Sequence, residues 1–146
     1  LVSNTLQSIT KAEMNQPFVA LVDHGTPLRA VNQIREEIGS QMEELLRPEI
    51  SGFSSCSMER REGEKYDFND PLLSPLLDEL SKEGQKEVVL AQLFLSPGRH
   101  AGRGGDLEEI CSSFEGRLTR TELLGTHPAI IEILEDRILS FSKELL

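Results

Sequence analysis

The chain has 146 residues, of which 25 are acidic and 15 basic, so its formal net charge at pH 7 is -10. This length fits one domain with its own core, and a strongly acidic chain without a basic stripe is unlike nucleic-acid-binding proteins. No apolar run approaches the roughly 20 residues of a membrane-spanning helix. We therefore expect no nucleic-acid or membrane partner and a cytoplasmic location, or the plastid stroma if a transit peptide has been removed.

Cysteine usage points the same way. Cys56 and Cys111 are the only cysteines, they lie far apart, and neither belongs to a CxxC pair. This pattern predicts neither a disulfide framework nor a zinc knuckle, and it favours a reducing compartment.

The first part of the chain predicts a strand followed by a helix. Residues 1–16 form a moderately polar N-terminal extension, in which Leu6 and Ile9 could dock a short helix. The apolar run 18–22 predicts a buried strand, and Thr26 with Pro27 predicts the N-cap and first position of the next helix. Spacings of three and four predict one buried apolar stripe on this helix, with Arg35, Glu36, Glu37 and Glu43 in solvent. The stripe comprises Leu28, Val31, Ile34, Ile38, Met42 and Leu45.

The same alternation continues to the end of the chain. Residues 50–58 are expected to form a second strand, and a charged loop over 59–69 leads to a helix capped by Asp70 and closed by Gly84. The apolar run 88–95 predicts the third strand. Asp106 is expected to cap a helix, residues 118–123 to form a fourth strand, and residues 126–146 to form a last helix. The residues expected on the inner face of that helix are Ile130, Ile131, Leu134, Ile138 and Phe141.

Strict alternation of strands and helices predicts a parallel sheet with helices on both faces. The expected fold is therefore a three-layer α/β domain over residues 17–146, built on a four-stranded parallel sheet. In such sheets, ligands bind in the crevice beyond the carboxyl ends of the strands. The residues that follow the first three strands are thus the candidates for function.

Three side chains follow strands in this way. His24 comes directly after the first strand, Glu59 after the second, and His100 after the third within a glycine-rich loop. Taken alone, each has an ordinary interpretation as a turn histidine or a surface glutamate. Together, two imidazoles and a carboxylate suit divalent iron, cobalt or nickel, and three protein ligands leave coordination positions open. His127 is interpreted as structural, because Thr126 and Pro128 already explain a helix start there.

Other motifs are less convincing. His24-Gly25 is part of the signature of histidine phosphatases, but Asp23 stands where the phosphate-binding arginine should be and would repel a phosphoryl group. The glycines around Arg103 lack the lysine and hydroxyl residue of a P-loop. No GxSxG elbow occurs.

The chain resembles the sirohydrochlorin chelatases, the small class II chelatases of sirohaem and cobalamin synthesis. The likeness runs from Phe18 to Arg137, with one insertion over residues 60–69 and with His24-Gly25-Thr26-Pro27 where the family has His-Gly-Ser-Arg. The segments that carry it are Val22-Asp23-His24-Gly25, Ser57-Met58-Glu59, Pro71, Phe94-Leu95-Ser96-Pro97-Gly98-Arg99-His100 and Leu124-Gly125-Thr126-His127-Pro128.

The resemblance implies a chelatase-like (flavodoxin-like) single domain, metal binding by His24 and His100, catalytic use of Glu59, no ATP, and a homodimer. We therefore expect insertion of Fe2+ or Co2+ into sirohydrochlorin, with no cofactor beyond this substrate metal. Glu59 and an imidazole would accept the pyrrole protons, since imidazole titrates near neutrality. The substrate carboxylates would meet Arg99, Arg103 and Arg29.

Two other functions stay open. One is a diverged, non-catalytic module that binds a tetrapyrrole or a metal for carriage or sensing. The other is an interaction protein without any metal affinity.

Overall fold

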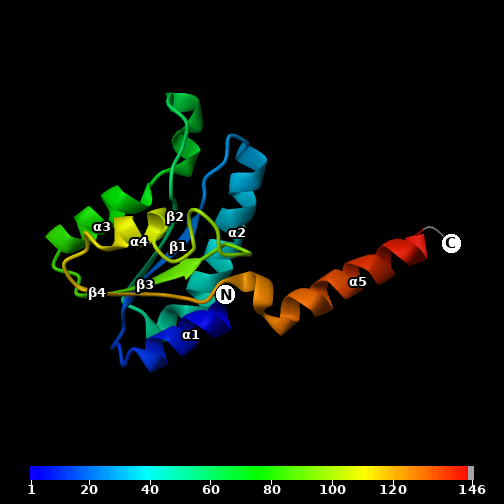
Figure 1. Ribbon diagram of the computed structural model, residues 1–146, viewed down its shortest axis with the longest axis horizontal. Coiled ribbons are helices and arrows are strands. Elements are labelled where there is room, and N and C mark those ends of the chain that lie inside the picture. Colours follow the sequence, from blue (N-terminus) through cyan, green and yellow to red (C-terminus); the bar gives the residue numbers. More distant parts are fainter. Residues whose placement is uncertain (145–146) are drawn as a thin grey trace.

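Four parallel strands form the sheet of the computed structural model, which describes residues 1–144. β1 (Phe18–Asp23) lies between β2 (Gly52–Ser57) and β3 (Glu87–Gln92), and β4 (Arg117–Arg120) pairs with the outer side of β3 (Figure 1). The middle residues of β1 and β3 are fully buried, as is typical of strands covered on both faces. The predicted α/β fold with a four-stranded parallel sheet is confirmed.

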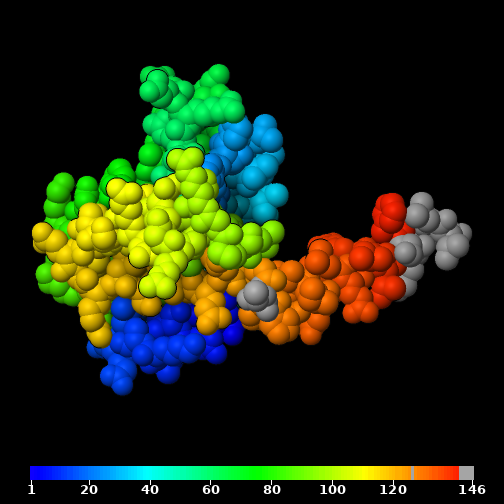
Figure 2. All heavy atoms as spheres, in the orientation of Figure 1, coloured from blue at the N-terminus to red at the C-terminus, as the bar shows by residue number. Residues whose placement is uncertain are grey.

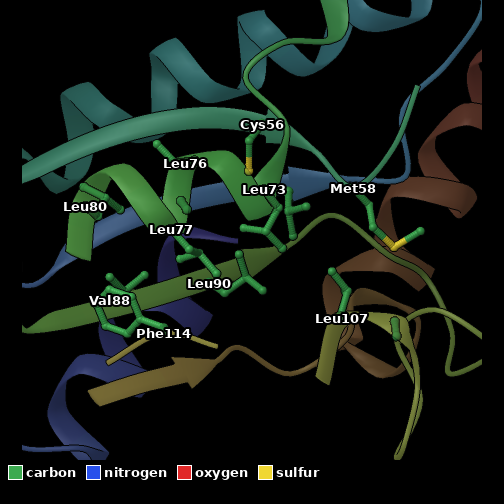
Figure 3. Close-up of a cluster of buried hydrophobic side chains, with 13 residues drawn as sticks. Cys56, Met58, Leu73, Leu76, Leu77, Leu80, Val88, Leu90, Leu107 and Phe114 are labelled. Atoms are coloured by element: carbon green, nitrogen blue, oxygen red, sulfur yellow. The ribbon is translucent and has the colours of Figure 1, made fainter. Parts of the chain in front are cut away.

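Helices cover the two faces of this sheet and make three layers. α1 (Val2–Lys11) and α2 (Arg29–Leu46) pack on one face, where Ile9, Met42 and Leu46 join the side chains of β1 and β3. α3 (Leu73–Lys82) and α4 (Asp106–Cys111) pack on the other face. There the α3 leucines and Leu107 lie against the other side of the strands (Figure 3). Short 3-10 helices occupy the connections, namely η1 (Arg47–Glu49), η2 (Glu64–Asn69) and η3 (Leu124–Thr126), and α5 (Pro128–Glu144) ends the described chain.

The N-terminal segment contributes to this core. Ile9 of α1 is buried against the sheet, whereas Leu6 stays partly exposed. The division of the chain after residue 16 stays a prediction.

The apolar stripe predicted for α2 is largely wrong. Leu28, Val31, Ile34 and Leu45 are between 47% and 66% exposed, and of the predicted stripe only Met42 is buried. The inner face instead carries Asn32, Arg35 and Gly39 together with Met42 and Leu46. Arg35, expected in solvent, is 1% exposed. The physical reason is that α2 crosses β2 at its serines, so polar and small side chains fit against the sheet better than branched ones.

Three predicted helix caps are also wrong. α2 begins at Arg29, so Thr26 accepts a hydrogen bond from the Leu28 N–H in the preceding turn instead of capping the helix. α3 begins at Leu73, and the Asp70 carboxylate binds Arg60. Asp106 is the first residue of α4 rather than its cap. Gly84 does follow the end of α3 as predicted, with a φ of 82° that suits glycine.

The last helix does not pack against the sheet. α5 runs away from the body of the molecule (Figures 1 and 2). Ile131, Leu134, Ile138 and Phe141, which were expected inside, are at least 53% exposed; only Ile130 of the predicted set is half-buried. The predicted end of this helix, residues 145–146, lies outside the described residues. Among the described helices, none has the length and apolarity that crossing a membrane requires.

Candidate functional site

His24 and Glu59 leave the sheet side by side. The parallel pairing of β1 with β2 continues past the strands, because the Met58 N–H donates to the Asp23 carbonyl (2.8 Å) and the Glu59 N–H donates to the His24 carbonyl (3.1 Å). His24 Nε2 lies 3.3 Å from Glu59 Oε1, with the two side chains 45% and 62% exposed. This pair is therefore held by main-chain hydrogen bonds and is open to solvent.

His100 reaches the same place from the loop after β3. The ring centroids of His24 and His100 are 4.6 Å apart, with an angle of 67° between the ring planes. Residues 76 positions apart in the sequence thus bring their imidazoles into contact. Of the three predicted site residues, His24 contacts both Glu59 and His100.

A carboxylate orients His100. Nδ1 of His100 lies 2.7 Å from Oδ2 of Asp106, the first residue of α4. A neutral imidazole that donates its Nδ1–H to a carboxylate presents the lone pair of Nε2, and this is the usual partnership of a metal-binding histidine. Sequence reasoning gave Asp106 no such role, although a carboxylate six residues after a histidine, at a helix start, was a usable signal.

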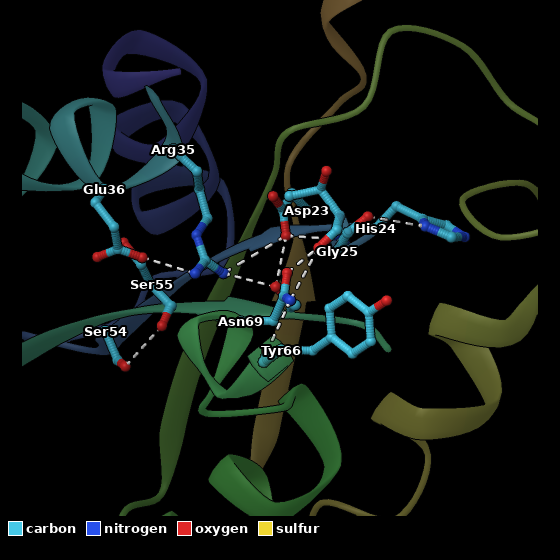
Figure 4. Close-up of polar contacts among 11 residues, drawn as sticks. Asp23, His24, Gly25, Arg35, Glu36, Ser54, Ser55, Tyr66 and Asn69 are labelled. Carbon is cyan, nitrogen blue, oxygen red and sulfur yellow. Dashed lines mark hydrogen bonds and ion pairs between the residues drawn. The ribbon is translucent and has the colours of Figure 1, made fainter. Parts of the chain in front are cut away.

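A polar network lies beside the His24 turn, toward the interior of the protein (Figure 4). The Asp23 carboxylate accepts hydrogen bonds from the Ser57 hydroxyl (2.9 Å) and the Gly25 N–H (3.1 Å). Arg35 Nη1 donates to Ser57 Oγ (2.9 Å) and lies 3.5 Å from the Asp23 carboxylate. Arg35 Nη2 is 2.7 Å from Glu36, so the buried guanidinium faces two carboxylates. Pairing of this kind is what makes a buried charge tolerable.

Gly25 allows the two turns to approach closely. Its φ is 96°, and a Cβ built on it would lie 1.9 Å from the carbonyl oxygen of Glu59. No other residue fits this backbone conformation and this space. The glycine that follows His24 is therefore a requirement of the contact between the two strand ends.

The segment predicted as an insertion forms one wall of the cleft. Buried Asn69 accepts the Thr26 N–H (2.9 Å) and donates to the Thr26 carbonyl (3.0 Å), which ties η2 to the His24 turn. This brings Arg60 and Arg61 beside His24 and Glu59, around a cleft of about 370 Å³. Sequence reasoning missed both arginines, because nothing in a charged loop indicates where it folds back.

The three predicted substrate-binding arginines lie in different surroundings. The Arg29 guanidinium stacks 4.7 Å above the Phe68 ring of η2. Arg99 is 85% exposed, with Nε 3.9 Å from the same Asp106 carboxylate that binds His100. Arg103 is exposed in the turn before α4. Of the three, Arg99 shares a carboxylate partner with His100.

The donor groups are arranged in pairs. Over the described residues, no cluster of three or more His, Cys, Asp or Glu side chains has the spacing of a preformed metal site. Neither thiol adds a donor, since burial raises the pKa of Cys56 to about 12 and that of Cys111 to about 11. His127 lies outside this arrangement, and its Nδ1 accepts the N–H of Ala129 (3.2 Å) at the start of α5.

Comparison with known proteins identifies the family of this chain. A Marinobacter aquaeolei protein described as a CbiX protein of cobalamin (vitamin B12) biosynthesis has a similar structure, with a TM-score of 0.62 at 18% identity, over 87% of this chain and 98% of that chain. At this identity the likeness concerns the fold alone. No curated protein gives a significant match. The family model of CbiX matches residues 19–140. The chain therefore belongs to the CbiX family, and this membership supports a role as a tetrapyrrole metal chelatase.

Proposed function

We propose that this chain inserts Fe2+ or Co2+ into sirohydrochlorin without ATP. The observation that carries the proposal is the contact between His24 and His100 at the carboxyl ends of the strands, with Glu59 beside His24 in a solvent-open cleft. Two imidazoles and a carboxylate are a donor set suited to these metals.

The substrate metal would be held by His24 and His100. The Nδ1 of His24 lies 3.3 Å from the Gly25 carbonyl, and that of His100 lies 2.7 Å from Asp106. When each ring carries its proton on Nδ1, both Nε2 atoms are left as donors to a metal. Glu59, which lies 3.3 Å from the Nε2 of His24, is in place to exchange a proton at that atom.

Insertion of a divalent ion releases two pyrrole protons. Glu59 would accept one, and the imidazole that gives up the metal would accept the other. Because His24 and Glu59 are 45% and 62% exposed, both protons can pass to water. The steps balance without a nucleotide, since the ring would lose two protons, its four nitrogens would bind the metal, and the two imidazoles would be released from it.

The carboxylates of the substrate would meet cationic side chains at the rim of the cleft. Arg60 and Arg61 line it, and Arg99 lies next to the carboxylate that binds His100. These local charges matter more to a bound anion than the distant net charge of -10, because salt screens charges over about 8 Å.

A second candidate is a module that binds the tetrapyrrole or the metal without converting it. It is favoured by the pairwise arrangement of the donors, in which the described residues form no complete three-donor cluster. Such a module would bind sirohydrochlorin or Co2+ and release it unchanged.

The experiment that tests the proposal is anaerobic incubation of the protein with sirohydrochlorin and Co2+ or Fe2+, followed by the absorbance of the macrocycle. We expect insertion above the uncatalysed rate, and we expect His100→Ala to bring the rate down to the uncatalysed level. His127→Ala is the matched control, because this imidazole accepts a hydrogen bond from the backbone at the start of α5, away from the cleft. Binding without conversion would support the second candidate, and unchanged turnover in His100→Ala would refute the site.

A further inference from the structure

Arg35 is a buried charge that the proposed chemistry does not use. Its side chain is 1% exposed on the inner face of α2, where a guanidinium gives up its hydration. A buried ion pair of this kind adds little net stability, since apolar side chains of similar volume are often as favourable or better. Stability alone therefore does not account for a charge at this place.

The hydrogen bonds of Arg35 lead to both sides of His24. Its Nη1 donates to the Ser57 hydroxyl at 2.9 Å, and this hydroxyl donates to Asp23 Oδ1 at 2.9 Å. The same carboxylate oxygen accepts the Gly25 N–H at 3.1 Å. Asp23 and Gly25 directly precede and follow His24, so this chain of hydrogen bonds runs from α2 to the turn that carries the imidazole (Figure 4).

The same guanidinium also joins the ends of two strands. Asp23 is the last residue of β1 and Ser57 the last of β2, and Nη1 lies 3.5 Å from the first and 2.9 Å from the second. Two positions after Ser57, the Glu59 N–H donates to the His24 carbonyl at 3.1 Å. The place of the Glu59 carboxylate beside the imidazole therefore depends on how these two strand ends are held together.

The two imidazoles of the site differ in what orients them. Nδ1 of His100 lies 2.7 Å from a carboxylate, whereas Nδ1 of His24 lies 3.3 Å from the Gly25 carbonyl, which is long for a hydrogen bond. The direction of the His24 ring thus depends mainly on its backbone. The Asp23 side chain is 15% exposed, so without the guanidinium it could turn to water and release the Gly25 N–H. Loss of Arg35 would then free the turn that carries His24.

We propose that Arg35 is a positioning residue, which acts through the Asp23 carboxylate to fix the direction of the His24 imidazole for metal binding. At 1% exposure it is out of reach of the metal and of the macrocycle, so its effect is indirect. The inference rests on the proposed function, because it takes His24 as a ligand of the substrate metal. In this view Arg35 does for His24 what Asp106 does for His100.

Calorimetric titration of the whole chain with Co2+ tests this role. Arg35→Met should weaken Co2+ binding at least about tenfold, which is the scale on which the supporting partners of metal ligands act. It should also shift the visible absorption of the bound Co2+, which depends on the geometry of the ligands. Arg35→Lys keeps the charge without the planar fork and should fall between the two. Arg47→Met, the same substitution at a 75% exposed position just after α2, is the control and should bind as the wild type does.

The affinity and the absorption together separate positioning from a loss of stability. Circular dichroism first identifies the conditions under which each variant is folded. In a folded variant, a merely structural role of Arg35 would leave the Kd and the spectrum of the bound Co2+ unchanged. A displaced His24 imidazole would change both.

Ser57→Ala provides the test if Arg35→Met does not fold. It leaves both charged groups in place and removes only the hydroxyl between them, so Co2+ binding should weaken several-fold. Ser54→Ala is its matched control, because this hydroxyl of the same strand donates to the Ser55 carbonyl (3.2 Å), and it should bind as the wild type does.

Two results would count against the inference in different ways. Wild-type affinity and absorption in a folded Arg35→Met, or in Ser57→Ala when Arg35→Met does not fold, would overturn it and leave the proposed function standing. A wild-type chain that binds no Co2+ would overturn both.

Discussion

At the scale of single residues, the cleft depends on groups that fix the direction of its imidazoles. Asp106 accepts a hydrogen bond from His100 at 2.7 Å, and its side chain is itself partly exposed, so it contributes orientation more than packing. The histidine and the carboxylate come from the loop after β3 and the first turn of α4. A change at Asp106 is therefore expected to act on binding with little effect on folding.

Asp106→Asn should weaken Co2+ binding by roughly 10- to 100-fold, because the amide oxygen is a poorer acceptor for the Nδ1–H of His100. Calorimetric titration of the protein with Co2+ measures this. Glu109→Gln, at an exposed position of the same helix, is the control and should leave the affinity unchanged. Equal affinities for the Asp106→Asn variant and the wild type would show that His100 needs no such support.

The sequence predicts part of this site and misses the rest for a clear reason. That His24, Glu59 and His100 share one edge follows from their positions after three strands of a parallel sheet. The structure does bring His24 to both of the others. Arg35 and Arg60 could not be assigned in the same way, because their roles depend on how a helix is rotated and on how a loop folds back.

At the scale of elements, α2 shows why apolar spacing alone can mislead. Its inner face holds Gly39, at which a Cβ would lie 2.2 Å from Ser55 Oγ, and Arg35, which binds Ser57. A polar strand edge selects a small and polar helix face, so the apolar stripe turns outward. In α3, by contrast, the leucines face the apolar side of the strands, and Leu73, Leu76, Leu77 and Leu80 are all buried.

This difference predicts unequal effects of two equal substitutions. Leu77→Ala removes a side chain that is 1% exposed and should lower the free energy of unfolding by about 2–5 kcal/mol. Leu45→Ala removes one that is 66% exposed and should change it by less than about 0.5 kcal/mol. Urea denaturation at a low protein concentration measures the free energy of unfolding of each variant and of the wild type. Equal losses would mean that α2 packs with its apolar stripe inward.

At the scale of the whole molecule, one ion pair joins the N-terminal segment to two strands. The Glu87 carboxylate of β3 pairs with Arg117 of β4 and accepts the Asn15 N–H (2.8 Å). Arg117 also donates to the Ala12 carbonyl (3.1 Å). Strand alternation predicts the sheet and its layers, but it contains no information on where residues before the first strand attach, so this joint could not be foreseen.

The ion pair between Glu87 and Arg117 predicts how the stability of the fold depends on pH. The hydrogen bond from Arg117, and then that from the Asn15 N–H, lower the pKa of Glu87 below its ordinary value. A lowered carboxyl pKa stabilises the fold above the ordinary pKa of about 4.3, and this contribution is lost as the pH falls through the lower, folded-state value. Glu87→Gln should therefore be less stable than the wild type at pH 7 and should lose less stability between pH 5 and pH 3.

Thermal unfolding over that pH range measures both effects. Glu115→Gln, at an exposed position near the start of β4, is the control and should follow the wild type. A Glu87→Gln variant whose acid destabilisation matches that of the wild type would assign the effect to other carboxylates.

The two sides of the cleft differ in how firmly the chain holds them. Main-chain hydrogen bonds run on past β1 and β2 as far as Glu59, and Gly25 lets the two turns interlock. His100 is attached differently, through a loop closed by its own local turns and by one carboxylate. A metal that must be bound and then released needs one ligand that is held firmly and one that is able to move. Here the ligand that is able to move would be His100.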